Sequence, residues 1–376
     1  MRRLAALTGI FLATIGLLAI ALVASAAPAE QPAGPVLRLN AGEGDGVVSM
    51  NGFNLPDVRV ARGTTIIWTV ASDEDHTITF LAGSPTPQLI LPQPEDPTGR
   101  PLMFSPEAFF PTPAIGPWDG RSYLNSSPIG RGQDFTVTFS TEGRFPYLCL
   151  FHPHSMTGTV EVVAPGGTGI TTQADVDRSI ATHTPTVHQP QIDQMLATRT
   201  NPDMIAGPAG STTWFVRAGT DWRNGHLDLV AFLPGELEIR QGDTVVWYVD
   251  HAVPHTVTFP VAGAAPPDFV LVQLPDGTVV PPDMLGPPPG GPPAGPPDPA
   301  LLPRLIVGPA GTQARPSPAH DGVSYYNSGL IGEHLLIPPL PKTWALTFDT
   351  PGEYEYVCVL HAGIGMVGKV IVLPRS

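Results

Sequence analysis

Residues 53–68 read FNLPDVRVARGTTIIW, and residues 232–247 read FLPGELEIRQGDTVVW, 179 positions further along the chain. Both stretches are rich in β-branched and aromatic residues and are interrupted by Arg62-Gly63 or Gln241-Gly242, which is typical of short strands joined by turns. A pattern that recurs in this way indicates a duplicated structural unit. We therefore expect an all-β protein made of two tandem β-sandwich domains.

The repeat continues beyond these strands. The segment HTITF that begins at His76 recurs as HTVTF from His255, and DGRSYLNS from Asp119 recurs as DGVSYYNS from Asp321. The offset between the copies grows along the chain, because the second copy has longer connections between matching segments. The sequence thus predicts two domains with the same order of strands.

The first residues differ in character from the repeat. Arg2 and Arg3 precede an uncharged apolar run that ends in Ala24-Ser25-Ala26, the pattern of a cleaved export signal. The run is also long enough to remain as a membrane anchor. In either case we expect an exported protein, which is periplasmic, extracellular or associated with the cell surface. The expected parts are a signal peptide or anchor at residues 1–26, a first domain at 36–164, a linker at 165–212 with a short helix around 174–180, and a second domain at 213–376.

Each copy carries an insertion between its first His and the Asn-Ser segment. Residues 281–300 contain ten prolines in twenty positions and are expected to form an extended, polyproline-like loop. The first copy's insertion, residues 81–118, is less rich in proline. Its apolar residues are expected to cover part of the domain surface at the ligand end; they are Met103, Phe104, Phe109 and Phe110.

The composition excludes some classes of protein. The chain has 33 acidic against 19 basic residues, a formal net charge of −14, which argues against binding to nucleic acid. It suits an exported protein that meets a basic partner. The 47 Pro and 40 Gly among 376 residues disfavour long helical bundles.

The same four residue types occur in the same order in both copies. The sets are His76, Cys149, His152 and Met156 in the first copy, and His255, Cys358, His361 and Met366 in the second. A thiolate and two imidazoles in a plane, with a weak thioether on the axis, form the ligand set of a blue-copper electron-transfer site. The recurring His and Met disfavour a disulfide between the two cysteines. We expect copper as the cofactor, with two ions per chain.

On these motifs, both halves resemble the cupredoxins, the plastocyanin and azurin family of type 1 copper proteins. The spacing is C-x2-H-x4-M in the second copy and one residue shorter in the first, which leaves the axial bond of Met156 open. The resemblance implies Greek-key β-sandwiches, one copper per domain and one-electron transfer. It also implies that His152 and His361 are exposed ligands through which electrons leave.

Other residues near the motifs have more than one interpretation. His154 competes with Met156 as a ligand, although Met156 would then follow too closely to reach the axis. His251 lies four residues before His255 and is interpreted as a rim residue, with a second metal-binding role left open. Thr77 and Thr256 follow the first His of each copy and are expected to hydrogen-bond near the thiolate.

The leading hypothesis for function is an electron carrier between exported redox proteins, among which the chain's charge favours a basic one. Copper delivery or storage at the cell surface is the alternative. A copper oxidase or nitrite reductase needs a His next to the site Cys, and here the flanking residues are Leu148, Leu150, Val357 and Val359. We therefore expect no enzyme activity, no nucleic-acid partner, and contact with a membrane only through an uncleaved anchor.

Overall fold

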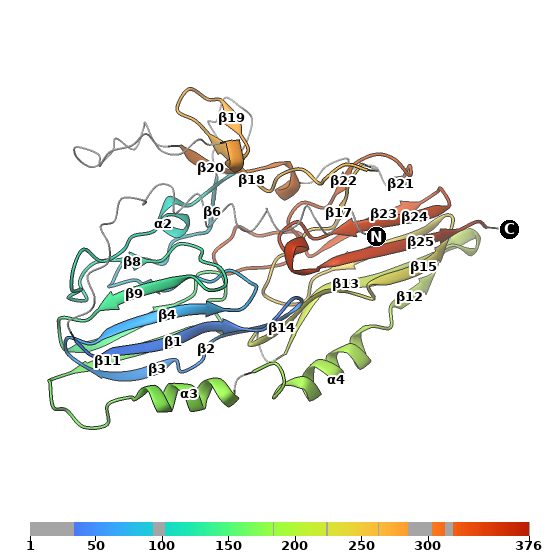
Figure 1. Cartoon of the computed structure of the whole chain (residues 1–376). Helices are drawn as coiled ribbons and strands as arrows, with labels where there is room; N and C mark the ends of the chain where they lie inside the picture. Colours follow the sequence, from blue (N-terminus) through green and yellow to red (C-terminus); the bar gives the residue numbers. More distant parts are fainter. Residues whose placement is uncertain are drawn as a thin grey trace. The chain divides into compact units, whose positions relative to one another are not determined.

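The computed structural model describes residues 34–92, 102–182, 184–222, 225–261, 263–284, 303–312 and 319–375. The regular secondary structure of these residues is mostly β-strand, which confirms the predicted all-β class (Figure 1). They group into two compact units. The first contains residues 34–45, Ser49–Val187 and Val272–Ile306, and the second contains Gly46–Val48, His188–Leu271 and Val307–Ser376. The predicted signal segment lies outside the described residues, as does most of the predicted proline-rich loop.

The first unit is a sandwich of two sheets. One sheet has the strand order β2 (Val48–Phe53), β1 (Val36–Glu43), β4 (Thr65–Ala71), β9 (Asp134–Thr138). The other has the order β3 (Asp57–Ala61), β11 (Thr157–Val163), β10 (Gly143–Leu148), β5 (Thr79–Phe80), β8 (Leu124–Asn125). Strand β1 pairs in parallel with β4, and β11 in parallel with β3, while the other pairs are antiparallel. The chain thus crosses between the sheets, as in a Greek key.

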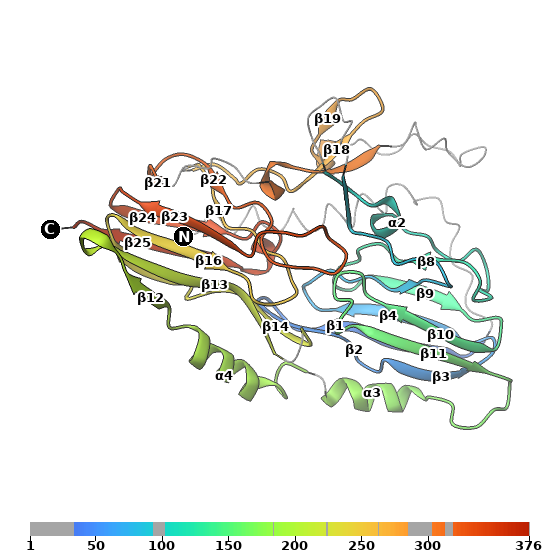
Figure 2. The same cartoon turned by 180° about the vertical axis from the view of Figure 1, so that it is seen from behind.

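The second unit repeats this arrangement and has two additional strands in its first sheet. One sheet has the order β14 (Leu227–Leu233), β13 (Thr212–Trp222), β16 (Asp243–Tyr248), β23 (Thr343–Phe348), β21 (Ala319–His320), and β12 (Asp203–Ala206) also pairs with β13. The other has the order β15 (Glu236–Arg240), β25 (Val367–Leu373), β24 (Gly352–Val357), β17 (Thr258–Phe259), β22 (Tyr326–Asn327). Figure 2 shows both sandwiches from behind. The tandem duplication expected from the sequence is therefore present in the fold.

A buried tryptophan marks the centre of each sandwich. Trp68 on β4 and Trp247 on β16 are fully buried, as the apolar, β-branched strands around them predict. The Trp68 ring meets Phe80 edge-on at 5.8 Å, and Trp247 meets Phe259 in the same way at 5.6 Å. Each buried aromatic side chain contributes roughly 1.5–3 kcal/mol to folding. This packing makes each sandwich a firm support for the loops at its end.

Helices lie between the two sandwiches in sequence. Helix α3 (Gln173–Thr182) confirms the helix expected around residues 174–180 and packs Val176 into the first unit's core. Helix α4 (Gln189–Arg199) was not expected; it buries Ile192 and Met195. None of the described helices is both long and apolar enough to cross a membrane. The predicted boundaries at 36–164 and 213–376 stay predictions.

The insertions contribute smaller elements. They are β6 (Ile90–Pro92), β7 (Leu102–Phe104), α2 (Pro106–Phe109), β18 (Val270–Gln273), β19 (Val279–Val280) and β20 (Arg304–Val307). Short 3-10 turns occur at Pro208–Gly210, Pro282–Met284, Pro309–Gly311 and Ala362–Ile364. In the first copy, the Phe104 ring packs at a tilt of 54° against Phe109, and the Phe109 ring lies 5.9 Å from that of Phe151 in the loop after β10. The apolar part of this insertion therefore does cover the end of the domain that carries the predicted ligands.

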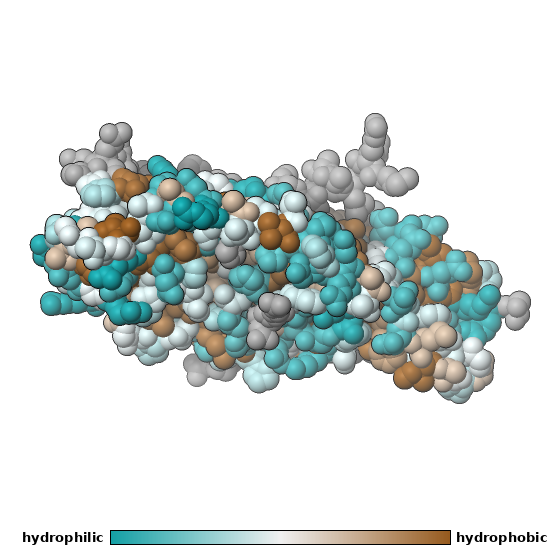
Figure 3. Space-filling view, turned by 90° about the horizontal axis from the view of Figure 1, so that it is seen from below, coloured by the Kyte–Doolittle hydropathy of each residue, from teal (hydrophilic) through white to brown (hydrophobic). Residues whose placement is uncertain are grey.

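The surface is mixed in character. On the face shown in Figure 3, hydrophobic residues form small separate groups among hydrophilic ones. Single exposed apolar side chains, such as Ile115 and Val323, are normal for a water-facing surface.

Candidate metal centres

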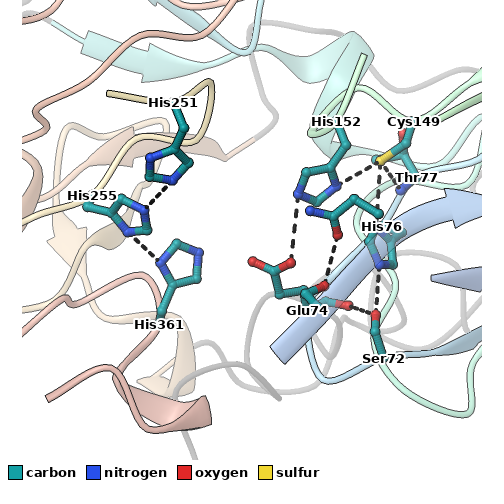
Figure 4. A network of polar contacts seen from close by, with 11 residues as sticks. Ser72, Glu74, His76, Thr77, Cys149, His152, His251, His255 and His361 are labelled. Carbon is teal, nitrogen blue, oxygen red and sulfur yellow. Dashed lines mark hydrogen bonds and ion pairs between the residues drawn. The ribbon is translucent and has the colours of Figure 1, made fainter. Parts of the chain in front are cut away.

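The first centre lies at one end of the first sandwich (Figure 4). Cys149 directly follows β10, and the Nδ1 atoms of His76 and His152 lie 3.9 and 3.8 Å from its Sγ. The backbone of His76 is held by paired hydrogen bonds with Ile129, which fixes it against the end of the sheet. All three side chains are buried. The fold therefore brings together the thiol and both imidazoles that the sequence singled out.

The second centre has the same construction. Cys358 follows β24, and its Sγ lies 3.7 Å from His255 Nδ1 and 3.5 Å from His361 Nδ1. The two Nδ1 atoms are 3.1 Å apart. The backbone of His255 pairs with Ile331 as that of His76 pairs with Ile129. The two centres thus arise from equivalent positions in the repeat.

The spacing of the donors fits a metal ion. Three donors at bond lengths of about 2.0–2.3 Å and angles near 120° lie about 3.5–3.8 Å from one another. The sulfur–nitrogen distances in both centres, 3.5–3.9 Å, agree with this, and the nitrogen–nitrogen distance in the second is somewhat shorter. One thiolate and two imidazoles are the planar donors of a blue-copper site. The residues present therefore suit copper in both centres.

The predicted axial methionines are both fully buried. In the first loop, the backbone carbonyl of Met156 accepts a hydrogen bond from Cys149 N, and its backbone N–H donates one to the His152 carbonyl, each at 2.9 Å. In the second, Met366 bonds in the same way with Cys358 N at 3.1 Å and the His361 carbonyl at 3.0 Å. A 3-10 turn ending at Gly365, with φ 106°, takes up the extra residue of the second loop. The axial role of both methionines stays a prediction.

His154, the competing ligand in the first loop, is exposed to solvent. It is not one of the residues that surround Cys149, whereas Met156 lies in the first unit's core with that cysteine. The structure therefore favours Met156 over His154.

A threonine after the first His supports each sulfur. Thr77 N and Thr256 N each donate a hydrogen bond of 3.3 Å to the cysteine Sγ, as expected from the sequence. Their hydroxyls accept bonds from Leu150 N and Val359 N, the residues after the cysteines. Burial raises the pKa of both thiols, although these hydrogen bonds oppose it. Metal binding must therefore displace a proton from each cysteine.

The role of a glycine that lies behind the first His of each copy was not predicted from the sequence. Gly42 on β1 and Gly219 on β13 have φ of +69° and +74°, and each sits at a break in the strand register. A Cβ at Gly42 would lie 2.2 Å from His76 Nε2, and one at Gly219 would lie 2.4 Å from His255 Nε2. Only glycine leaves room for these rings. The available signal was an Ala-Gly pair before the repeated strands in both copies.

The residue four positions before each first His also contacts it. Ser72 Oγ lies 2.7 Å from His76 Nε2 and donates a bond of 2.9 Å to the Glu74 carbonyl, so it accepts from the imidazole. In the second centre, His251 Nε2 lies 3.1 Å from His255 Nε2. His251 is only 9% exposed. The interpretation of His251 as a rim residue is therefore wrong, because its side chain turns inward against the ligand.

The expected exposure of the loop histidines also needs correction. His152 is only 8% exposed, and its Nε2 faces Glu74 Oε2 at 3.9 Å. His361 is partly buried. Of the two predicted exit ligands, His152 is thus buried, and Glu74 lies against its Nε2.

Burial controls the protonation of the site. It lowers the pKa of His76 and of His361 to about 3 and that of His255 well below its usual value, so these imidazoles are neutral and able to bind a metal. Burial raises the pKa of Glu74 to about 6, against hydrogen bonds from Ser49 and Asn51. The histidine ligands are therefore in the neutral state that copper requires, whereas the buried thiols must still lose a proton.

Comparisons with known sequences match copper proteins of the plastocyanin/azurin family. Residues 327–373, which include Cys358, His361 and Met366, match the family model for copper binding proteins of the plastocyanin/azurin family. A plastocyanin from Synechococcus sp. (strain JA-2-3B'a(2-13)) is 28% identical over 168 residues, 45% of this chain and 79% of the relative. A chloroplastic plastocyanin from Tetradesmus obliquus is 58% identical over 31 residues, 8% of this chain and 21% of the relative. Among solved structures, a Cu(I) mutant of amicyanin matches with a TM-score of 0.22 and 16% identity, over 35% of this chain and 87% of that one.

Proposed function

We propose that this chain, which belongs to the cupredoxin family of copper-binding proteins, carries single electrons between exported redox partners through one copper ion in each domain. The observation that supports the proposal best is the recurrence of a two-His, one-Cys group at equivalent positions of both sandwiches, with both cysteines fully buried. The relatives named plastocyanin agree with an electron-carrying role. Export is proposed from Arg2, Arg3 and the apolar run that follows them.

The chain's own residues account for the properties that such a carrier needs. When bound, copper supplies a one-electron couple between Cu(II) and Cu(I). The ligands come from strand ends and short loops fixed by backbone hydrogen bonds, so they can keep one arrangement in both oxidation states. Because Cys149 and Cys358 are buried, water and other thiols are kept away from their sulfur atoms. A rigid and dry site favours electron transfer over exchange of the metal.

The same features speak against the other hypotheses. Both sulfurs are buried, whereas copper delivery needs ligands that a recipient can reach. No His stands next to either cysteine, as an oxidase with a second copper centre would require.

The test is a visible absorption spectrum of the purified, Cu(II)-loaded chain, with copper counted per chain. We expect two coppers and an intense thiolate-to-copper band that a reductant bleaches. Cys149→Ser and Cys358→Ser should each remove about half of the band, and the double variant should remove all of it. Far-UV circular dichroism of each variant provides the control for folding.

Two results would contradict the proposal. One is bound copper without a thiolate band in the unchanged chain. The other is a band of full intensity in Cys358→Ser, since the sulfur of that centre would then not be a ligand.

A further inference from the structure

His251 is buried in the second unit without a role in the ligand set. Its ring lies against His255, with centroids 5.1 Å apart and planes inclined by 41°. Its Nε2 faces His255 Nε2 at 3.1 Å, and its Nδ1 is buried with no hydrogen-bond partner among the described residues. Figure 4 shows the imidazole of His255 between those of His251 and His361, with a contact to each. A buried imidazole nitrogen without a hydrogen-bond partner costs stability, so its presence in the folded domain calls for an explanation.

The protons on these rings follow from their geometry. His255 turns Nδ1 toward Cys358 Sγ, at 3.7 Å, so Nδ1 must be free of a proton to bind a metal there. Its proton then sits on Nε2, which faces His251 Nε2. His251 must accept through Nε2 and carry its own proton on Nδ1. The contact is therefore an N–H···N hydrogen bond directed from the ligand to His251.

The pocket is built around both rings. A Cβ at Gly219 would lie 2.6 Å from His251 Cε1 as well as 2.4 Å from His255 Nε2, so this one glycine makes room for the pair. In the first unit, Gly42 does the same for His76 and Ser72, with a Cβ that would lie 2.7 Å from Ser72 Oγ. Both units thus place an acceptor behind the first His, and they differ only in its chemistry.

We infer that His251 is a positioning residue of the second copper centre, which orients His255 and makes it a stronger donor than His76. The inference rests on the proposed function. A ligand His whose other N–H is bonded to a good acceptor is more basic and better oriented. A neutral imidazole nitrogen is more basic than a serine hydroxyl and is therefore the stronger acceptor. His251 therefore favours Cu(II) over Cu(I) at its own centre more than Ser72 does at the other.

The experiment uses the full chain with Cys149→Ser, so that the second centre is the only one with a thiolate. His251→Leu removes the acceptor, while His251→Gln keeps a carbonyl oxygen at about the reach of Nε2. We expect Leu to lower the ratio of Cu(II) to Cu(I) affinities about tenfold, which raises the reduction potential by about 59 mV. Gln should restore most of the original potential.

A second readout does not depend on redox behaviour. In ¹⁵N-edited NMR of the Cu(I)-loaded protein, we expect a slowly exchanging proton on His255 Nε2 and a His251 protonated at Nδ1. In His251→Leu the His255 Nε2 proton should exchange faster and move upfield. The matched variant in the first domain, Ser72→Ala with Cys358→Ser, should raise that centre's potential by less.

The outcomes separate the inference from the proposed function. If Cys149→Ser shows no blue copper band, the proposed function fails at this centre. If the band is present but His251→Leu changes neither the potential nor the His255 proton, the positioning role is wrong. A His251 protonated at Nε2 in the Cu(I) protein would also overturn it.

Discussion

The two centres share their ligands and differ in the four residues that precede the first of them. The first copy reads Ser72-Asp73-Glu74-Asp75-His76 and the second reads His251-Ala252-Val253-Pro254-His255. Three carboxylates in one domain are replaced by three apolar residues in the other. The strand frame around both is the same. The fold therefore dictates the donor atoms, while their surroundings have diverged.

The difference reaches the ligands in both cases. In the first domain, the Glu74 carboxylate faces the outer edge of His152. Burial raises the pKa of Glu74 to about 6 and that of Asp75 to about 7, and in Asp75 the neighbouring Glu74 adds to the effect. In the second domain, Val253 is buried and the polar contact is made by His251 instead. The first centre thus has a serine at His76 and a carboxylate at His152, whereas the second has a histidine at His255.

The largest expected effect comes from replacing the glycine that lies against the first His of each centre. Gly219→Ala should remove copper from the second centre and leave the first intact, because the new Cβ would meet His255 in a backbone conformation that alanine rarely adopts. Gly42→Ala should do the reverse. We expect at least a tenfold loss of copper affinity at the altered centre, measured as remaining thiolate band at limiting Cu(II).

Gly63 offers a control within the first domain. It also has a positive φ, of +92°, but no heavy atom lies within 4 Å of where its Cβ would be. Gly63→Ala should therefore lower the stability of the domain by about 1 kcal/mol without changing its copper affinity. An equal loss of copper in Gly63→Ala and Gly42→Ala would show that strain, and not the His76 contact, is responsible.

The next prediction tests whether the shorter loop of the first domain places its methionine as an axial ligand. Met366→Leu should raise the potential of the second centre by at least about 60 mV, a tenfold change in the ratio of Cu(II) to Cu(I) affinities, because the weak axial donor stabilises Cu(II). We expect Met156→Leu to do the same in the first, since both methionines are buried and bonded alike to their loops. The potentials are measured by titration of the blue band in chains with only the relevant cysteine.

A shift in the second centre alone would mean that the first lacks an axial sulfur. The comparison would then extend from the surroundings of the ligands to the ligand set itself.

The sequence was sufficient for the features that depend on repetition. The fold class followed from matching strand segments, and the six thiol and imidazole donors that meet in the structure followed from their order in both copies. Repetition was informative because the residues that match between the two copies are those of the strands and of the donor set.

What the sequence could not predict depends on tertiary contacts. The burial of His251 arises from a strand bulge at Gly219 that opens a space for two rings, and no local pattern records such a space. Helix α4 buries only Ile192 and Met195, too few apolar positions to reveal a helical face. His152 was expected to be exposed because the resemblance does not place the Glu74 carboxylate beside its ring.

The smallest expected effect concerns the cores of the two domains. Where the first has Trp118, the second has His320, which is 3% exposed and packed among Phe259, Tyr354 and other aromatic rings. Burial lowers the pKa of His320 to about 4, although the Asp321 carboxylate opposes this. In the unfolded chain a histidine titrates near pH 6.5. Between these values the unfolded state binds more protons, so the second domain loses stability as the pH falls from about 6.5 toward 4.

His320→Trp, which copies the first domain, should remove this loss. Between pH 7 and pH 5 we expect the unchanged second domain to lose about 1–2 kcal/mol more stability than the variant does. The measurement is urea unfolding followed by loss of the blue band in chains with Cys149→Ser, where the pH dependence of copper binding is common to both proteins and cancels. His320→Phe provides a smaller apolar ring if tryptophan does not fit. An identical pH dependence in all three chains would mean that the buried imidazole is protonated in the folded domain as easily as in the unfolded one. The exchange of Trp for His between the domains would then have no consequence for the pH dependence of stability.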